Sequence, residues 1–275
     1  MKSEICRREL VELLRVSLGA LALAAPLVLS LAHGAQAPET APPPNALSAA
    51  EKAAGWRLLW DGRTTDGWRS ARSEGFPTQG WTIENGVLMT RENGGHESAG
   101  GGDIITEKRY ADFELTVDFK LTPGANSGIK LFVQPGLAPI SVTGGKATVG
   151  SAIGIEFQVL DDERHPDAKL GHDGNRTLGS LYDLIPAPVD KKVSPMGAWN
   201  QARVLAQGRH VEFWLNGVKT VEFERGSSRF RELVAASKYK GIPGFGEWED
   251  GHILLQEHGN EVWFRNVKIR ELASR

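Results

Sequence analysis

The 275-residue chain has only one cysteine and three methionines, and it has no excess of either charge. Its cysteine, Cys6, stands close to the N-terminus, so disulfide bonds and thiol chemistry are excluded for everything downstream. The 32 Lys and Arg residues nearly balance the 34 Asp and Glu residues, which gives a formal net charge of −2. This balance argues against nucleic acid or an anionic membrane surface as the partner.

Long apolar runs are also scarce, and the one that stands out covers residues 16–32. Basic residues precede this run, and the small-x-small sequence Ala-Gln-Ala follows it at 35–37, so residues 1–37 are predicted to be a secretory signal peptide. A permanent membrane anchor is the alternative. The pair Arg7-Arg8 also resembles a twin-arginine export signal. We expect an exported protein, periplasmic or extracellular, with no stable membrane insertion after cleavage.

The region that follows the apolar run is rich in proline. Residues 38–50 are predicted to be an extended linker, and residues 47–54 have the composition of a short helix. The folded domain is therefore expected to occupy residues 51–275.

Strand signals dominate this domain. Residues 112–121 alternate strictly between polar and apolar, which predicts a strand with one buried face and one solvated face. Asn-Gly pairs at 85–86 and 216–217 predict tight type I′ hairpins. One helix is expected at 229–237. Further strands are expected at 56–60, 81–84, 87–90, 127–134, 153–160, 178–184, 200–206, 211–215, 218–223, 253–257 and 262–272.

Many strands with few helices predict an all-β fold. Two antiparallel sheets packed face to face, as a sandwich or jelly roll, would bury the apolar faces of these strands. One sheet of such a fold often curves, and its outward face then forms a groove. Polar side chains that face this groove are the first candidates for chemistry.

Two predicted strands carry polar residues of this kind. Glu156 and Gln158 alternate with apolar residues that should enter the core, and Lys130 is opposite in phase to its apolar neighbours. A solvated outer face is the ordinary explanation for such residues. A third candidate region holds Gln256 and His258, and the ordinary pKa of histidine suits a proton shuttle.

The segment 161–183 is long, polar and punctuated by glycine, which is typical of a functional loop. Its histidine and aspartate spacing fits neither a helical zinc site nor an EF-hand. No cofactor is therefore required by the pattern, although a divalent ion such as Ca²⁺ held by loop oxygens remains open. The residues of this loop that could bind either a metal ion or the substrate are His165, Asp167, His172, Asp173 and Arg176.

Several short motifs occur in a fixed order along the domain. They are LLWDG at 58–62, DGW at 66–68, WTIENG at 81–86, DFEL at 112–115, NSGI at 126–129, GIEFQVLD at 154–161 and FRNV at 264–267. In this order they resemble the 3-keto-disaccharide hydrolase family, over residues 56–272. The resemblance implies a concanavalin A-like jelly roll, found in exported bacterial proteins. It also implies cleavage of glycosides already oxidised to the ketone at C3, with a small carbohydrate as the partner.

Retaining glucanases of this fold carry further acidic residues on the catalytic strand. Here the corresponding positions are Glu156, Gln158 and Leu160, so this strand lacks the carboxylate pair that double displacement requires. A 3-keto sugar needs less, because the ketone makes the hydrogen on C2 acidic. One base, a cation or donor for the enolate oxygen, and an acid for the leaving group suffice.

These needs suggest roles for particular residues. We hypothesise that Glu156 or His258 is the base, and that Lys130, Gln158 or a metal ion faces the enolate oxygen. Substrate contacts are expected from Asn126, Asp161, Tyr182, Gln256 and Trp199, with Trp68 and Trp248 as further stacking candidates.

Two other functions remain open. A lectin-like, non-catalytic carbohydrate-binding module would share the fold, because fold does not determine function. An ordinary glycosidase is less compatible with the strand sequence. The sequence does not determine the aglycone, the oligomeric state or the export route.

Overall fold

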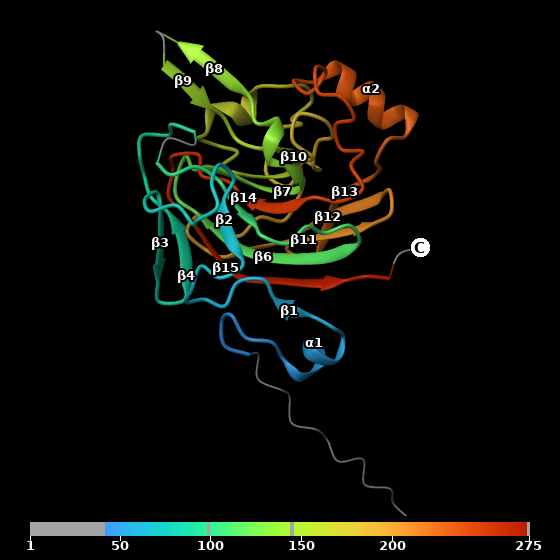
Figure 1. Cartoon of the computed structure of the whole chain (residues 1–275). Helices are drawn as coiled ribbons and strands as arrows, with labels where there is room; N and C mark the ends of the chain where they lie inside the picture. The colour runs from blue at the N-terminus through green and yellow to red at the C-terminus, as the bar shows by residue number, and fades with distance from the viewer. Residues whose placement is uncertain (1–41, 98–99, 144–145, 274–275) are drawn as a thin grey trace, which may run out of the picture. The chain divides into compact units, whose positions relative to one another are not determined.

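Two antiparallel sheets pack face to face in the computed structural model, which describes residues 42–97, 100–143 and 146–273 (Figure 1). The predicted all-β sandwich is therefore confirmed. The first sheet has eight strands, in the order β13 (Val218–Glu224), β12 (His210–Leu215), β11 (Asn200–Gln207), β6 (Phe113–Leu121), β15 (Val262–Glu271), β4 (Val87–Thr90) and β3 (Trp81–Glu84), with β1 (Arg57–Leu58) paired to β15.

The second sheet has five strands and carries the residues of interest. Their order is β10 (Ile153–Leu160), β7 (Asn126–Gln134), β14 (His252–Leu255), β5 (Ile104–Thr106) and β2 (Trp68–Ser70). The apolar core lies between the two sheets. Phe119 and Phe213 enter it from the eight-stranded sheet, and Ile129 and Phe157 enter it from the five-stranded sheet.

The Asn-Gly turns form as predicted. Asn85 and Gly86 have φ angles of 50° and 72°, and Asn216 and Gly217 have φ angles of 49° and 78°. Positive φ at both central positions is the type I′ geometry, whose twist matches that of the flanking strands. These turns join β3 to β4 and β12 to β13, which fixes their antiparallel register.

The segment 178–184 is not a strand, contrary to the prediction. Gly179 and Asp183 have positive φ angles, which break the extended backbone that its apolar residues suggest. The segment still lies along the free edge of β10. The Tyr182 N–H donates to the Glu156 carbonyl at 3.0 Å, and the Gly179 N–H donates to the Gln158 carbonyl at 2.9 Å.

Several short strands were missed because they are too short to show a period. They are β2, β5 and the separate hairpin of β8 (Ile140–Thr143) and β9 (Lys146–Val149). The predicted helices do form, as α1 (Ala49–Ala53) and α2 (Ser228–Ala236). A capping box of Ser48 and Glu51 starts α1.

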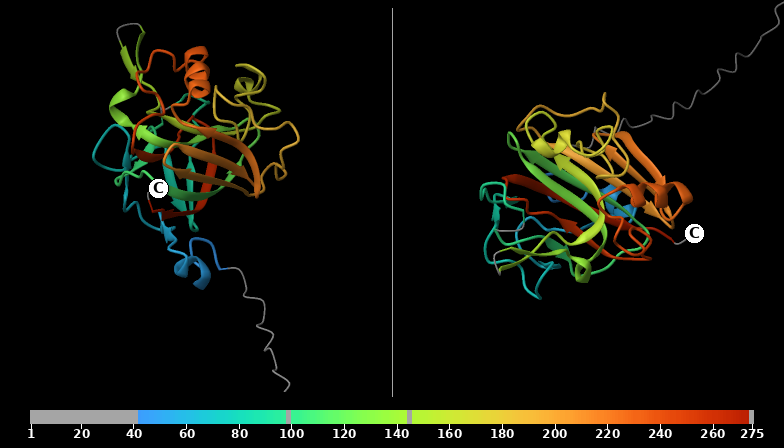
Figure 2. Two further views of the ribbon diagram at one scale, coloured as in Figure 1. Left: turned by 90° about the vertical axis from the view of Figure 1, so that its right-hand side faces the viewer. Right: turned by 90° about the horizontal axis from the view of Figure 1, so that it is seen from above.

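The outward faces of the two sheets have different coverings. The hairpin β8–β9 and α2 stand above the five-stranded sheet, whereas α1 lies below the eight-stranded sheet (Figure 1). The two turned views in Figure 2 place the long loop that follows β10 on the same side as α2. The five-stranded sheet therefore has a walled outward face.

The predicted signal peptide, residues 1–37, lies outside the described residues, as does the start of the predicted linker. Within the described part of the chain, no helix has both the length and the apolar character that crossing a membrane requires.

Candidate functional site

The outward face of the five-stranded sheet brings together four of the predicted polar residues. Because side chains alternate along a strand, the positions between the core residues of β10 and β7 point away from the other sheet. Hydrogen-bonded pairing then aligns these positions in two rows across the strands. The rows are Glu156–Lys130–Leu254 and Gln158–Gly128–Gln256.

Glu156 is buried although its side chain faces outward from the sheet, with an exposed fraction of 4%. Its carboxylate lies over Gly128 on the neighbouring strand, where a methyl group in place of hydrogen would collide with Oε1 of Glu156. Gly128 thus provides the space for this carboxylate. The glycine is required by close approach rather than by its backbone angles.

The ammonium group of Lys130 lies beside this carboxylate. Its Nζ is 3.7 Å from Oε2 of Glu156. It donates to the hydroxyl of Ser151 and, at 3.2 Å, to the carbonyl of Ala152. Lys130 is 5% exposed, so these partners replace the water that an ammonium ion needs.

A pocket of about 260 Å³ opens above this pair of residues. Lys130 lines it from β7, Ser151 lines it from the segment before β10, and Glu97 and Lys238 line it from other loops. Glu156 is not among the lining residues, and it lies behind the pocket as the ion-pair partner of Lys130, which does line it. The chemistry of the pocket therefore depends on two ammonium groups and on carboxylates from separate parts of the chain.

Lys238 follows α2 and was not predicted. Its backbone N–H donates to Oδ2 of Asp183 at 2.8 Å, which fixes the residue beside the 178–184 segment. Its Nζ lies 4.1 Å from the centre of the Tyr182 ring and 5.2 Å from that of Tyr239. Part of the residue is exposed, while its ammonium lies beside the two tyrosine rings and lines the pocket. Its ammonium is thus available to a ligand.

Burial and charge shift the pKa values of these groups in different directions. Burial raises the pKa of Glu156, and the positive charges of Lys130 and Lys238 offset part of that rise. Loss of hydration lowers the pKa of Lys238, which the Glu156 carboxylate counteracts. A carboxylate with a raised pKa is a stronger base than a solvated one, and an ammonium with a lowered pKa is a better acid.

Tyr182 lies beside the same pair of charges. Burial, the nearby Glu156 carboxylate and its own hydrogen bond raise the pKa of Tyr182, so the phenol stays protonated. Its hydroxyl donates to Oδ2 of Asp167 at 2.7 Å. The ring therefore serves as a wall under Lys238, and its hydroxyl is already committed.

The amides of the second row are buried, and that of Gln256 reaches Glu97, which lines the pocket. Nε2 of Gln158 lies 3.4 Å from Oδ1 of Asn126, and Nε2 of Gln256 donates to Oε1 of Glu97 at 3.1 Å. Oε1 of Gln256 has no hydrogen-bond partner among the described residues, although Gln256 is only 4% exposed. A buried acceptor without a partner is costly unless a ligand or water completes it.

The chain matches the family of 3-keto-alpha-glucoside-1,2-lyase-like domains over residues 55–270. It belongs to this family. A curated relative, the 3-keto-disaccharide hydrolase of Bacteroides thetaiotaomicron, is 36% identical over 188 residues. The alignment covers 67% of this chain and 64% of the relative, so the chain spans less than two thirds of that protein.

Crystal structures of two candidate glycosyl hydrolases from Parabacteroides distasonis are also similar to this family member. The first is 31% identical, with a TM-score of 0.69, and the match covers 84% of this chain and all of that one. The second is 25% identical, with a TM-score of 0.54, and the match covers 79% and 99% of the two chains.

In this family member, His258 lies in the segment that follows β14, and it does not line the pocket. It follows Gln256 by two residues, and its ring meets that of His165 edge to face, with ring centres 5.7 Å apart. Nδ1 of His258 is buried and has no partner among the described residues. Burial and the neighbouring His258 lower the pKa of His165. The ring contact places His258 beside the loop that follows β10.

Asp161 and the predicted tryptophans do not join the pocket. Asp161 accepts the Gly124 N–H at 2.7 Å and pairs with Arg164, so it secures a loop. Trp199 lies against Arg265, with the guanidinium carbon 4.0 Å from the ring centre, on the outward side of the eight-stranded sheet. Trp68 lies in the core with an exposed fraction of 3%, and Trp248 packs against the core from outside. Aromatic content did not reveal which rings face the substrate, because most of them pack with cations or core residues.

Charged residues of the loop 161–183 form ion pairs with one another. Arg176 donates to Asp167 at 2.7 Å and to Asp183 at 2.6 Å. Among the described residues, the group of side chains with metal-ligand spacing is His210, Glu212 and Glu222, on the other sheet. Lys219 already bonds two of those carboxylates. The Ca²⁺ interpretation of the loop therefore stays a prediction without a ligand cluster behind it.

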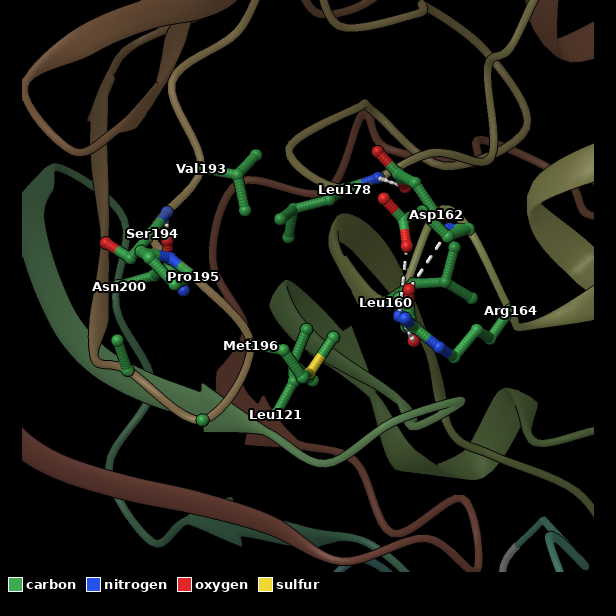
Figure 3. A pocket seen from close by; sticks show the side chains of 14 residues that line it. Leu121, Leu160, Asp162, Arg164, Leu178, Val193, Ser194, Pro195, Met196 and Asn200 are labelled. Atoms are coloured by element: carbon green, nitrogen blue, oxygen red, sulfur yellow. Dashed lines mark hydrogen bonds and ion pairs between the residues drawn. The ribbon is translucent and has the colours of Figure 1, made fainter.

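Another hollow, of about 460 Å³, lies at the end of β10 and is shown in Figure 3. Its lining is largely apolar, and its carboxylates are taken. Asp162 accepts the Leu178 N–H at 2.7 Å and pairs with Lys191 at 2.8 Å, and Asp161 pairs with Arg164. This hollow lacks an uncommitted acid or base, in contrast to the pocket above Glu156 and Lys130.

Proposed function

We propose that this protein cleaves the glycosidic bond of 3-keto-glycosides or 3-keto-disaccharides, with Glu156 as the base that removes the C2 proton. The observation that carries the proposal is a buried carboxylate of raised pKa, placed beside two ammonium groups at the edge of a pocket. Family membership supports the substrate class, and the name of the Bacteroides relative agrees with it.

The proposed reaction needs a base but no carboxylate nucleophile from the protein. Glu156 takes the proton from C2, and the electron pair moves toward the C3 ketone to give an enolate. The enolate then re-forms the ketone, a C1–C2 double bond forms, and the C1–oxygen bond breaks. The leaving oxygen takes a proton and departs as an alcohol. Water adds across C1 and C2, so the net change consumes one water for one glycosidic bond.

The two lysines have different roles in this proposal. The donors of Lys130 are directed to Ser151, Ala152 and Glu156, so it is less suited to the enolate than the sequence alone suggested. Lys238 has an ammonium that faces the pocket over the Tyr182 ring. Its charge stabilises the enolate oxygen, and its lowered pKa lets it share a proton.

The unpartnered oxygen of Gln256 supports a role for this residue in binding a sugar hydroxyl. A hydroxyl donor from the substrate would complete this buried acceptor and orient the ring over Glu156 and Lys130. Gln158 and Asn126 support the same row through their mutual contact. His258 lies beside the loop that follows β10, where it would meet the second sugar unit.

The test compares trehalose oxidised at C3 with trehalose itself. We expect glucose release from the oxidised sugar only, because the unoxidised sugar has no acidic C2 hydrogen. Binding of either sugar without release would support a lectin-like module and contradict the proposal. A parallel reaction with a chelator tests whether a divalent ion takes part.

Glu97 favours one other function. It brings a second carboxylate into the pocket from a loop far from β10, so the missing pair on the catalytic strand is no longer decisive. Ordinary glycoside hydrolysis with Glu97 and Glu156 would cleave both forms of trehalose equally. Equal cleavage, lost in the Glu97→Gln variant, would establish that function instead.

We also propose export by cleavage after Ala37. Basic residues, an apolar run and a small-x-small site in that order support it. Fractionation of cells that express the full chain, with N-terminal sequencing of the product, should yield a periplasmic or secreted protein that begins at Pro38. Full-length protein in the membrane fraction would favour the anchor.

A further inference from the structure

Two buried polar residues, Asp103 and Ser151, extend the chain of hydrogen bonds behind Lys130, and the reaction scheme uses neither of them. Asp103 stands immediately before β5, and Ser151 stands shortly before β10. Asp103 is 2% exposed and Ser151 is 6% exposed. Neither residue lies on a predicted strand, so alternation gave no reason to single them out.

The hydrogen bonds of Asp103 have a definite direction. Its Oδ2 accepts from the Ser151 hydroxyl at 2.5 Å and from the Ala152 N–H at 3.2 Å, and its Oδ1 accepts from the Glu257 N–H at 3.0 Å. A serine hydroxyl has a single hydrogen. Because Ser151 gives that hydrogen to Asp103, it must act as the acceptor toward Lys130.

This polarity holds the ammonium of Lys130 in place. Lys130 donates to Ser151 and to the Ala152 carbonyl, which leaves its third hydrogen for Glu156, 3.7 Å away. A single positive charge thus stands between two buried carboxylates. Burial raises the pKa of Asp103 as it does that of Glu156, and Lys130 lowers both.

We infer that Asp103 and Ser151 are positioning residues, which fix Lys130 as the counter-ion of Glu156 and so keep that carboxylate ionised for proton removal. The inference rests on the proposed function, since it explains how the proposed base is kept in its active form. Without the fixed ammonium, a buried carboxylate would take up a proton at a higher pH and lose its basic form.

Other charged and titratable groups also act on Glu156, and they are the same in the wild type and in the Ser151 variants. They are Lys238 after α2, Glu97 on the loop before Asp103, Tyr182 beside β10, and Tyr239. Changes at Ser151 leave all four in place. Asp103 also acts on Glu156, because its negative charge raises the pKa of Glu156. The Ser151 variants keep this carboxylate, so a displacement of their pH profile reports on the fixation of Lys130.

The experiment measures kcat/KM on 3-keto-trehalose across pH for the wild type and Ser151→Ala. Asp103→Asn should move the profile less than Ser151→Ala does, because it also removes a negative charge that raises the pKa of Glu156. The acid side of this profile reports the pKa of the base in the free enzyme. Weaker fixation of Lys130 raises that pKa, so the acid limb should move to higher pH by about one unit, with about tenfold less activity below it. Ser73→Ala, at an exposed serine, should behave as the wild type.

Two further variants separate positioning from structural damage. Ser151→Thr keeps the hydroxyl and should restore the wild-type limb. Lys130→Met should move the limb further, and adding Ser151→Ala to it should move the limb no more, because both changes act through one ammonium. Loss of activity at every pH with an unmoved limb in folded Ser151→Ala would overturn the inference.

Failure of the inference can be distinguished from failure of the proposed function. An inactive wild type on 3-keto-trehalose refutes the proposed function. An active wild type that loses turnover in Glu156→Gln, but whose acid limb is unaffected by Ser151→Ala, refutes only the positioning roles. Thermal unfolding of each variant identifies those that fail to fold.

Discussion

The outward face of each sheet carries a buried glutamate, and the two glutamates differ in how their charge is paired. On the eight-stranded sheet, Glu114 is buried and bonds both Arg203 and Arg270, at 2.6 Å from Nε of the latter. On the five-stranded sheet, Glu156 is equally buried and lies 3.7 Å from Lys130. Glu114 has its charge satisfied twice, whereas Glu156 is left with a longer ion pair beside a pocket. The comparison indicates that incomplete pairing, rather than burial, distinguishes the candidate site.

The largest difference in activity is expected between the variants that neutralise Glu156 and Glu114. Glu156→Gln should lower turnover of the 3-keto substrate about a thousandfold, because the base is lost. Glu114→Gln should leave turnover within about twofold and lower the free energy of unfolding by about 1 kcal/mol, as two partly solvated arginines lose their anion. Kinetics and denaturant unfolding measure the two effects. Equal activity of both variants would refute the assignment of Glu156.

Two lysines that contact aromatic rings give the next comparison. Lys238 lies over Tyr182 in the pocket, and Lys219 lies 5.8 Å from the Trp214 ring centre on the other sheet. Lys238→Met should reduce kcat about 100-fold through loss of enolate stabilisation. Lys219→Met should leave kcat unchanged. A reduced kcat in both variants would point to a general effect of charge.

The space that Gly128 leaves for the Glu156 carboxylate can be tested by replacing glycines with alanine. In Gly128→Ala, the new methyl group displaces the Glu156 carboxylate, and kcat/KM should fall on the order of tenfold. Gly136→Ala adds a methyl group where nothing lies within 4 Å and should be neutral. Wild-type kinetics of Gly128→Ala would mean that the carboxylate position does not matter.

The smallest expected effect concerns substrate binding. Gln256→Leu removes the unpartnered acceptor and should raise KM roughly fivefold, the equivalent of about 1 kcal/mol for one hydrogen bond, with kcat little changed. Gln207→Leu, a partly buried glutamine on β11 of the other sheet, is the control. An unchanged KM in Gln256→Leu would remove the sugar hydroxyl from this position.

The sequence predicted those parts of the site that lie on regular strands. Glu156, Gln158 and Lys130 are found by alternation alone, because strand geometry decides which side they face. Lys238 and Asp103 stand in irregular segments, and only tertiary packing brings them to the same place. Trp199 was misplaced for the same reason, since the strand it precedes belongs to the other sheet.

The fold followed a similar division. Long strands and the Asn-Gly hairpins were predicted almost to the residue, because their patterns are local. The strands β2 and β5 span three residues each, too few to repeat a period. The 178–184 segment is apolar because it is buried against β10, although its backbone turns at Gly179 and Asp183.

The 178–184 segment protects the edge strand β10 from pairing with another molecule and from local opening. β10 ends the order of its sheet, yet Gly179 and Tyr182 bond its outer side and leave little room for a strand from another molecule. The amide of Gln158 is also taken, by the Ser180 carbonyl at 3.1 Å. The strand that bears Glu156 is thus clamped from both flanks, and its amide protons should exchange with solvent as slowly as those of an interior strand.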